Sequence, residues 1–185
     1  MSKAVLMSIQ PKWCELIADG KKTLEIRKTV PREFFREYFK ESNGKCGDYF
    51  EPFKVYIYCT KADSYFDASD RFWLYSPPHD TPIQGNGKVI GEFVCNRIRP
   101  INLYVGWLVD VVDCETSCLT EREILEYAGG VSGKRIYGWH ISDLVIYDKP
   151  KGLGGFTRLR ETKFGYEPVK IKRPPQSWCY VEERK

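Results

Sequence analysis

Short segments with the pattern of β-strands recur along the chain, and they restrict its fold more than any other feature. Val5, Met7 and Ile9 alternate with other residues, which is the period of a strand. We predict strands in residues 3–10, 22–29, 54–60, 87–98 and 137–147, and a last one in 173–183. Gly91 falls inside the fourth of these and predicts a bulge or the close approach of another backbone.

Helices are predicted between these strands, over residues 11–19, 31–41 and 120–128. Pro11 suits the first turn of the first helix, and Gly20 suits the left-handed residue that ends it. Thr120 and Glu123 have the spacing of a capping box at the start of the last helix. The three helices separate groups of short strands, so the elements do not alternate in a simple pattern.

This mixture of elements indicates an α+β fold, with a small, partly closed β-barrel and two or three flanking helices. The length of 185 residues favours a single domain, 1–185. We expect insertions at about 31–50 and 61–86 and a basic C-terminal segment, 149–185. Within that segment, residues 149–168 are predicted to form a glycine-rich loop.

Positive charge is concentrated in the C-terminal segment. The chain has a net charge of +4, and residues 149–185 hold ten Lys and Arg against four Asp and Glu. Such a segment could bind a polyanion, although an excess of positive charge more often forms only a solvated basic surface. Candidates for phosphate contacts are Lys151, Arg158, Arg160 and Lys163. An aromatic content of 15% fits either core packing or a surface on which bases stack.

The cysteines and the apolar runs argue against several classes of protein. Seven Cys and two His without a C-x-x-C pair lead us to expect no zinc site, no disulfide and a cytoplasmic location. No apolar run reaches the ~20 residues of a membrane span, and the N-terminus lacks the pattern of a signal peptide, so we expect no membrane partner. Neither a G-x-G-x-x-G motif nor a P-loop is present, and we expect no cofactor.

The stretch GKKTLEIR gathers charges of both signs around two apolar residues. On a strand, Leu24 and Ile26 would face the core, while Glu25 and Arg27 would lie side by side on the other face. A carboxylate oriented by an arginine can accept a hydrogen bond from an exocyclic amine, as Glu does from cytosine. Lys22 could contact a phosphate or a carbonyl, or act as a base or nucleophile.

This stretch resembles the G-x-K-x-x-E-x-R signature of the ASCH domain, a member of the PUA-like superfamily, through Gly20, Lys22, Glu25 and Arg27. The segments GKVIGEF, YGWHISDLVIY and RPPQSWCYVEE also resemble later parts of ASCH chains, so the resemblance spans most of the sequence. It implies a PUA-like β-barrel with a cleft beside the first helix. It also implies that the signature residues line this cleft, and that the protein binds RNA or a nucleoside or nucleotide.

The resemblance implies a hydrolase as the alternative. One branch of small ASCH proteins hydrolyses N4-acetylcytidine with a Lys at the position of Lys22, a Thr at the position of Glu25 and a downstream Glu. The Glu at position 25 differs from that branch and disfavours this activity, and other ASCH proteins are ribonucleases. If the protein is an enzyme, Lys22 and Glu25 are its candidate catalytic residues. The nearest sources of the further carboxylate are Glu121, Glu123 and Glu126.

Other interpretations of these residues stay open. Lys22, Glu25 and Arg27 could form only a surface patch of ion pairs, each worth about 0–1 kcal/mol. The chain could also be a protein-interaction adaptor. Trp13 and His140 are expected to have structural roles, Trp13 because it shares an apolar helix stripe. The candidate ligand-binding residues are Gln10, Lys22, Glu25, Arg27, Arg158 and Arg160, and no metal ligand is predicted.

Overall fold

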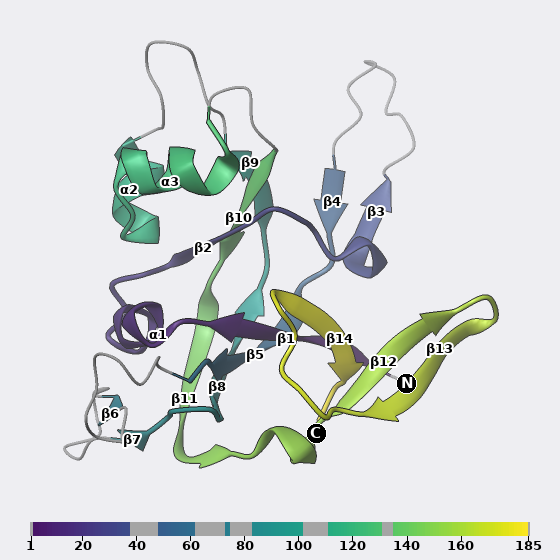
Figure 1. Ribbon diagram of the computed structural model, residues 1–185. Coiled ribbons are helices and arrows are strands. Elements are labelled where there is room, and N and C mark those ends of the chain that lie inside the picture. Colours follow the sequence, from purple (N-terminus) through teal and green to yellow (C-terminus); the bar gives the residue numbers. More distant parts are fainter. Residues whose placement is uncertain are drawn as a thin grey trace. The chain divides into compact units, whose positions relative to one another are not determined.

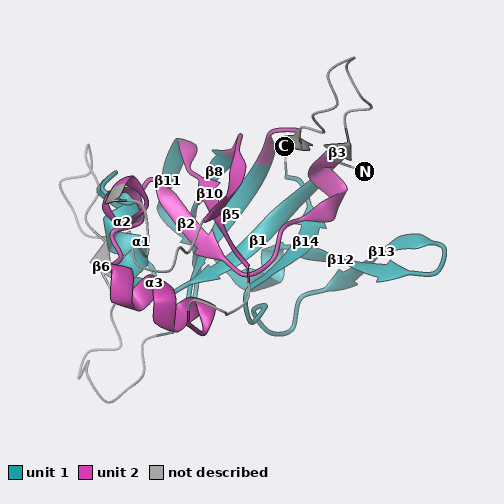
Figure 2. Cartoon of the chain, turned by 90° about the horizontal axis from the view of Figure 1, so that it is seen from above, with its two compact units in different colours: residues 1–22, 54–94, 143–185 teal, residues 23–53, 95–142 magenta. Residues whose placement is uncertain are grey.

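The chain divides into two compact units, each assembled from segments that are far apart in the sequence (Figure 2). Unit 1 comprises residues 1–22, 54–94 and 143–185, and unit 2 comprises residues 23–53 and 95–142. The computed structural model describes residues 2–37, 48–61, 73–74, 83–101, 111–130 and 135–184. The predicted insertions at 31–50 and 61–86 therefore lie partly outside the described residues.

Unit 1 contains most of the described strands, which are labelled in Figure 1. They are β1 (Lys3–Ile9), β5 (Phe53–Cys59), β6 (Trp73–Leu74), β7 (Ile83–Gln84), β8 (Val89–Cys95), β11 (Ser142–Lys151), β12 (Thr157–Thr162), β13 (Gly165–Lys170) and β14 (Trp178–Glu182). The first residue of β5, the last of β8 and the first of β11 are assigned to unit 2. Helix α1 (Pro11–Ala18) follows β1, and the short 3-10 helix η2 (Leu153–Gly155) follows β11.

Seven strands of unit 1 form one sheet in the order β11-β8-β5-β1-β14-β12-β13, and β6 pairs with β7 separately. Strand β1 lies in the middle of the sheet, parallel to β5 and antiparallel to β14. Its residues from Ala4 to Met7 are all buried, because both of its faces are covered. One core cluster of this unit consists of Ala4, Leu6, Tyr56, Tyr58, Val89, Phe156, Ile171, Cys179 and Val181.

Gly91 allows β8 and β11 to lie close together. A Cβ atom at this position would lie 2.4 Å from the carbonyl oxygen of Val145 and 3.1 Å from Cδ1 of Ile146. No side chain fits at the first of these distances, so the predicted close approach of another backbone is confirmed.

Unit 2 is built on a three-stranded antiparallel sheet with the order β2-β10-β9. These strands are β2 (Leu24–Arg27), β10 (Ile136–His140) and β9 (Ile98–Ile101). The unit also contains the 3-10 helix η1 (Arg32–Phe34), the paired strands β3 (Phe35–Glu37) and β4 (Asp48–Phe50), and the helices α2 (Val111–Ser117) and α3 (Glu121–Ala128). Its core joins one face of the sheet to α3 through Leu24, Ile26, Ile101, Ile124, Ala128 and Ile136.

Local signals in the sequence set the ends of two helices as predicted. Pro11 is the first residue of α1, and Gly20 beyond its end has a φ of +71°. At the start of α3, the Thr120 hydroxyl accepts a hydrogen bond from the Glu123 N–H at 3.2 Å, and the Glu123 carboxylate accepts one from the Thr120 N–H at 2.8 Å. Gly129 ends α3 with a φ of +91°.

The helix predicted over residues 31–41 is wrong where the structure describes it. Residues 32–37 form η1 and β3 instead, and 38–41 lie outside the described residues. Phe34 stacks on Phe53 with ring centroids 4.3 Å apart, and Phe35 pairs with Phe50 on β4. These partners lie later in the chain, and their contacts override the local helical pattern of aromatic residues.

The loop predicted over residues 149–168 is also wrong. The structure extends β11 to Lys151 and then forms η2, β12 and the greater part of β13. Strands β12 and β13 pair in register from Thr157 opposite Lys170 to Thr162 opposite Gly165. The basic residues in this region therefore lie on a regular hairpin. With this correction, the predicted α+β class is confirmed, and the seven-stranded sheet as described ends in two unpaired edges, β11 and β13.

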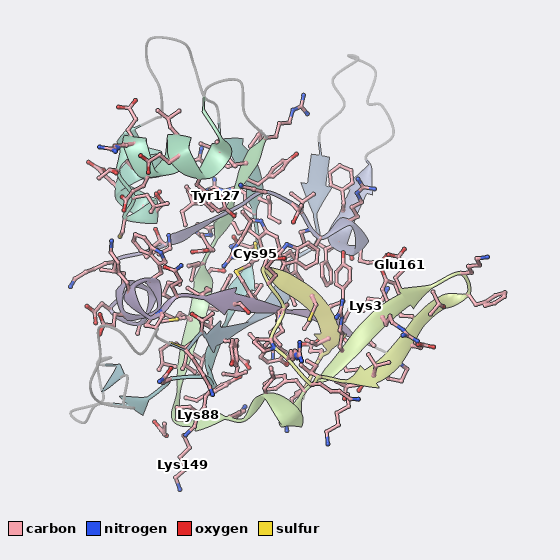
Figure 3. The ribbon with its side chains drawn as sticks, viewed as in Figure 1. Lys3, Lys88, Cys95, Tyr127, Lys149 and Glu161 are labelled. Atoms are coloured by element: carbon pink, nitrogen blue, oxygen red, sulfur yellow. The ribbon has the colours of Figure 1, made fainter. Side chains whose placement is uncertain are left out.

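The helices that the structure describes are short, and none of them is long and apolar enough to cross a membrane. Six cysteines fall within the described residues, and all six are free thiols. Cys95 (Figure 3) is one that burial makes inert, since burial raises the pKa of its thiol to about 12.

Candidate functional site

Glu25 and Arg27 lie side by side on β2, as the alternation of the strand predicted. Nη2 of Arg27 is 2.9 Å from Oε1 of Glu25, and the two side chains are 10% and 8% exposed. The other carboxylate oxygen of Glu25 and Nε of Arg27 are also enclosed by protein. A surface patch is therefore the wrong description of this pair, because both charges are withdrawn from water.

Aromatic residues share the sheet face of this ion pair. Glu25 lies opposite Trp139 and Arg27 opposite Tyr137 in the pairing of β2 with β10. Residues directly opposite one another in an antiparallel pair project from the same face, with Cβ atoms about 5 Å apart. Trp139 is fully buried, and its ring meets Phe53 edge to face at 5.6 Å. The buried charges therefore lie within an aromatic surface of unit 2.

Tyr127 lies near this pair and was not among the predicted site residues. The residue is on α3 (Figure 3), and Nζ of Lys28 lies 4.7 Å from its ring centroid. Burial raises the pKa of Tyr127, the charge of Arg27 lowers it, and the charge of Glu25 raises it, so both charges act on the phenol. One signal could have found it: Tyr127 follows the buried Ile124 by three residues and so borders the apolar face of the helix.

Lys22 belongs to unit 1 and is only 2% exposed. Its Nζ lies 5.2 Å from the ring centroid of Trp13, and its N–H donates to the carbonyl of Leu16 at 2.9 Å. Trp13 is half-buried, and Nζ of Lys12 lies 4.3 Å from the same ring. Trp13 therefore has contacts beyond the structural role that was predicted for it. Its ring also faces two cations, and a desolvated contact of this kind is worth about 2 kcal/mol.

The other predicted ligand-binding residues also belong to unit 1. Gln10 is exposed and precedes α1, where its carbonyl accepts the N–H of Cys14 at 3.0 Å. Arg158 and Arg160 are exposed on β12, and Arg160 forms an ion pair with Glu167 across the hairpin. The structure thus places the six candidates on three parts of the chain: β2, the two ends of α1, and β12.

His140 has the structural role that was predicted for it. Its Nδ1 lies 2.8 Å from Oδ1 of Asn96, and its N–H donates to the carbonyl of Arg97 at 2.9 Å. Burial, followed by the nearby charge of Arg97, lowers the pKa of the imidazole. Both features suit a neutral histidine that ties β10 to the turn before β9.

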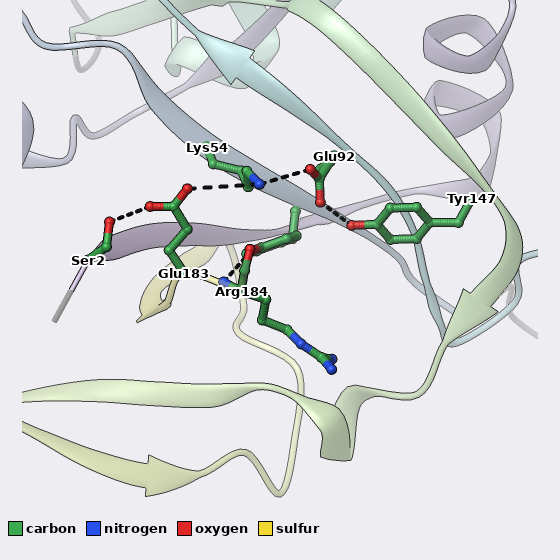
Figure 4. A network of polar contacts seen from close by, with 7 residues as sticks. Ser2, Lys54, Glu92, Tyr147, Glu183 and Arg184 are labelled. Atoms are coloured by element: carbon green, nitrogen blue, oxygen red, sulfur yellow. Dashed lines mark hydrogen bonds and ion pairs between the residues drawn. The ribbon is translucent and has the colours of Figure 1, made fainter.

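A second polar cluster in unit 1 joins three strands to the residue that follows a fourth, and it was not anticipated from the sequence (Figure 4). Nζ of Lys54 on β5 lies 3.0 Å from Oε1 of Glu92 on β8 and 3.8 Å from Oε1 of Glu183, which follows β14. The hydroxyl of Tyr147 on β11 donates to Oε2 of Glu92. Burial alone would raise the pKa of Glu92, but its hydrogen bonds with Tyr147 and Lys54 lower it. Both oxygens of Glu92 have partners, which suits a role in holding the strands together.

Comparisons with known proteins find similarity at the level of structure alone. No family model matches the sequence, and no curated protein matches it. The chain is similar to the crystal structure of ASCH from Zymomonas mobilis, with 16% identity, a TM-score of 0.47, and coverage of 97% of this chain and 88% of that one.

A serine-to-alanine variant of the same Zymomonas mobilis protein is similar at 15% identity, with a TM-score of 0.48 and coverage of 97% and 89%. The likeness is to the family whose signature the residues around Glu25 resemble. At this identity and TM-score it decides nothing about substrate or activity.

Proposed function

We propose that this protein is an RNA- or nucleotide-binding module that recognises a base through Glu25 and Arg27. The observation that supports this most is the buried ion pair, with 2.9 Å between Arg27 Nη2 and Glu25 Oε1, on a sheet face that it shares with Trp139 and Tyr137. Lys22 of unit 1 occupies the Lys position of the signature that Glu25 and Arg27 complete, and its proposed role is that of the base or nucleophile in the second candidate function.

The chemistry of this face matches the edge and the plane of a base. A carboxylate accepts hydrogen bonds from the exocyclic amine of cytosine, and an arginine donates to carbonyl oxygens. Trp139 is fully buried, but the half-buried ring of Tyr137 could stack on the plane of a base, a contact that contributes about 1–3 kcal/mol per base. Burying two charges costs several kcal/mol per ion, so a buried pair is weak evidence of a purely stabilising role.

A hydrolase is the second candidate, and the burial of Lys22 favours it. This residue is 2% exposed and lies against the ring of Trp13. Lysines removed from water serve as bases and nucleophiles in enzymes. Glu25 in place of Thr argues against the N4-acetylcytidine type of reaction, so binding remains the first proposal.

The test compares nucleotides that differ in the exocyclic amine. Titration calorimetry should show cytidine 5′-monophosphate binding more tightly than uridine 5′-monophosphate, which lacks the amine. Glu25→Gln should weaken cytidine 5′-monophosphate about tenfold and remove the preference, because an amide no longer offers two acceptors. Glu115→Gln on α2 is the matched control, since it removes the same charge from an exposed residue of unit 2. Equal binding by the Glu25→Gln and Glu115→Gln variants would contradict the proposal.

The same protein should be incubated with N4-acetylcytidine, and the release of acetate should be measured. We expect little or no turnover by the unaltered chain. Robust turnover that Lys22→Ala abolishes would replace the binding module with the hydrolase. A gain of turnover in Glu25→Thr alone would support the assignment of that position, because this change restores the residue of the hydrolase branch.

A further inference from the structure

The hairpin of β12 and β13, residues 157–170 and here named the arm, extends from the seven-stranded sheet of unit 1 (Figure 1). Its turn carries Phe164, which is 100% exposed. The Thr162 hydroxyl accepts a hydrogen bond from the Phe164 N–H at 3.2 Å and donates one to the carbonyl of Gly165 at 2.9 Å. Gly165 has a φ of +116°, which favours glycine. The turn thus holds a ring in water, where it adds nothing to the core.

Positive side chains are distributed along the arm, from the turn to its base. Lys163 precedes Phe164 in the turn, while Arg158 and Lys170 lie nearer the base, and all of them are exposed. Within the part of the chain that the structure describes, Arg160 forms an ion pair across the arm, whereas Arg158, Lys163 and Lys170 form none. Proteins that bind single strands of nucleic acid combine two features, cations that bind phosphates and aromatic rings that stack on bases. The arm carries both.

The edge position of β13 raises the question of a second copy of this chain as the partner. An open edge pairs with another strand through its backbone N–H and carbonyl groups. Pro168 in β13 has no N–H, and Lys170 adds a charge to the same strand. Proline and lysine are the residues with which proteins protect an edge against pairing. The edge of the arm is therefore unsuited to joining two copies.

A membrane surface is also a poor match for the arm. Its exposed apolar surface at the tip is a single ring, and the turn is followed by Gly165. Lasting attachment to a membrane needs a larger apolar face or two separate signals. A base, by contrast, needs only one ring to stack on.

We propose that the arm binds single-stranded nucleic acid, with Phe164 stacking on an unpaired base and Arg158, Lys163 and Lys170 contacting phosphates. This contact goes beyond the proposed function, because a base recognised by Glu25 does not require the arm. The stacking chemistry is shared by RNA and DNA, so both are used as probes.

The test measures the binding of the full chain to a fluorescein-labelled uridine strand of about 12 nucleotides, a usual site size for such proteins. Phe164→Ala should raise the dissociation constant about tenfold, which is the fold-change that corresponds to the loss of one stacked base. Phe164→Tyr keeps the ring and should bind as the unaltered protein does. Because Phe164 is fully exposed, its replacement should leave the thermal unfolding temperature unchanged, so a loss of binding cannot come from a loss of fold.

A strand with 2-aminopurine in place of one base reports the stack directly. Its fluorescence should be quenched by the unaltered protein and by Phe164→Tyr, but not by Phe164→Ala. The combined change of Arg158, Lys163 and Lys170 to Gln should reduce the salt dependence of binding, by about 0.7 in the log–log slope for each phosphate contact that is lost. An equal slope in this variant, or equal quenching by Phe164→Ala, would overturn the proposal.

Further probes separate the partners and the two proposals. Equal weakening of RNA and DNA strands by Phe164→Ala assigns the arm to single strands in general, whereas weakening of one alone assigns it to that one. If Phe164→Ala weakened binding to anionic vesicles or to an acidic peptide but left binding to nucleic acid unaffected, the assignment of the arm to nucleic acid would be overturned. Cytidine 5′-monophosphate should respond to Glu25→Gln and not to Phe164→Ala. A negative result for the arm therefore leaves the proposed base site unaffected. A negative result for the base site likewise leaves the proposal for the arm unaffected.

Discussion

At the scale of single residues, the buried charges on β2 are the feature with the largest energetic consequence. Each charge loses its hydration on burial, and only a close partner compensates for that loss. Glu25 and Arg27 provide this for one another, with side chains 8% and 10% exposed. Removing one member should therefore cost far more than removing a member of an exposed pair.

We predict that Arg27→Ala lowers the free energy of unfolding by about 3 kcal/mol, because the carboxylate of Glu25 is left in the protein interior. The double variant Glu25→Leu, Arg27→Met should cost less than Arg27→Ala, since it leaves no buried charge. Urea denaturation measures both values. Arg122→Ala is the control, as Arg122 forms an exposed pair with Glu126 at 2.8 Å in the same unit. If Arg27→Ala cost no more than this control, the pair would not be buried in solution.

At the scale of elements, the contact between β8 and β11 depends on a residue without a side chain. Gly91 of β8 faces the backbone of Val145 and the side chain of Ile146. Backbone atoms cannot move aside as a flexible side chain can, so an added carbon must push the two strands apart. The packing of two strands therefore rests on one glycine.

Gly91→Ala is predicted to lower the free energy of unfolding by about 2 kcal/mol, the usual cost of overpacking. Gly152→Ala provides the comparison, because its Cβ would meet no atom within 4 Å and its φ is −68°. That change should be neutral or should stabilise the protein by about 0.5 kcal/mol. Thermal and urea unfolding measure both. A neutral Gly91→Ala would show that β8 and β11 are farther apart than described.

At the scale of the whole molecule, the cluster around Glu92 links stability to pH. It joins β5, β8 and β11 to the residue after β14, so its loss affects strands along much of the seven-stranded sheet. The pKa of Glu92 is lower in the folded protein than its ordinary value of 4.5. The folded state therefore binds this proton less readily than the unfolded state does. Its stabilising contribution is present above pH 4.5 and is lost as the pH falls below that value.

We predict that the unaltered protein loses more stability than Glu92→Gln between about pH 6 and about pH 3, because the variant has no carboxylate to protonate. At neutral pH, Glu92→Gln should cost about 2 kcal/mol, in line with hydrogen bonds to charged groups. Glu161→Gln on the arm (Figure 3) removes the same charge from an exposed residue and should leave the pH dependence almost unchanged. Parallel pH profiles for the unaltered protein and Glu92→Gln would refute this role.

Features that depend on neighbouring residues were predictable from the sequence. The period of β1, the capping box of α3 and the turn at Gly20 each follow from a few adjacent positions, and a glycine within a strand pattern indicated the close approach at Gly91. The same holds for the pairing of Glu25 with Arg27, because residues two apart on a strand share a face.

Only the tertiary structure decided the features that depend on distant partners. Residues 32–37 form η1 and β3 and not a helix, because Phe34 stacks on Phe53 and Phe35 pairs with Phe50. Residues 157–170 became a hairpin because the two halves of this basic segment pair with one another. The burial of Glu25 and Arg27 likewise depends on β10, which lies far along the chain and places Trp139 and Tyr137 beside them. Local patterns determine the conformation of a short segment, whereas burial is determined by the parts of the chain that cover it.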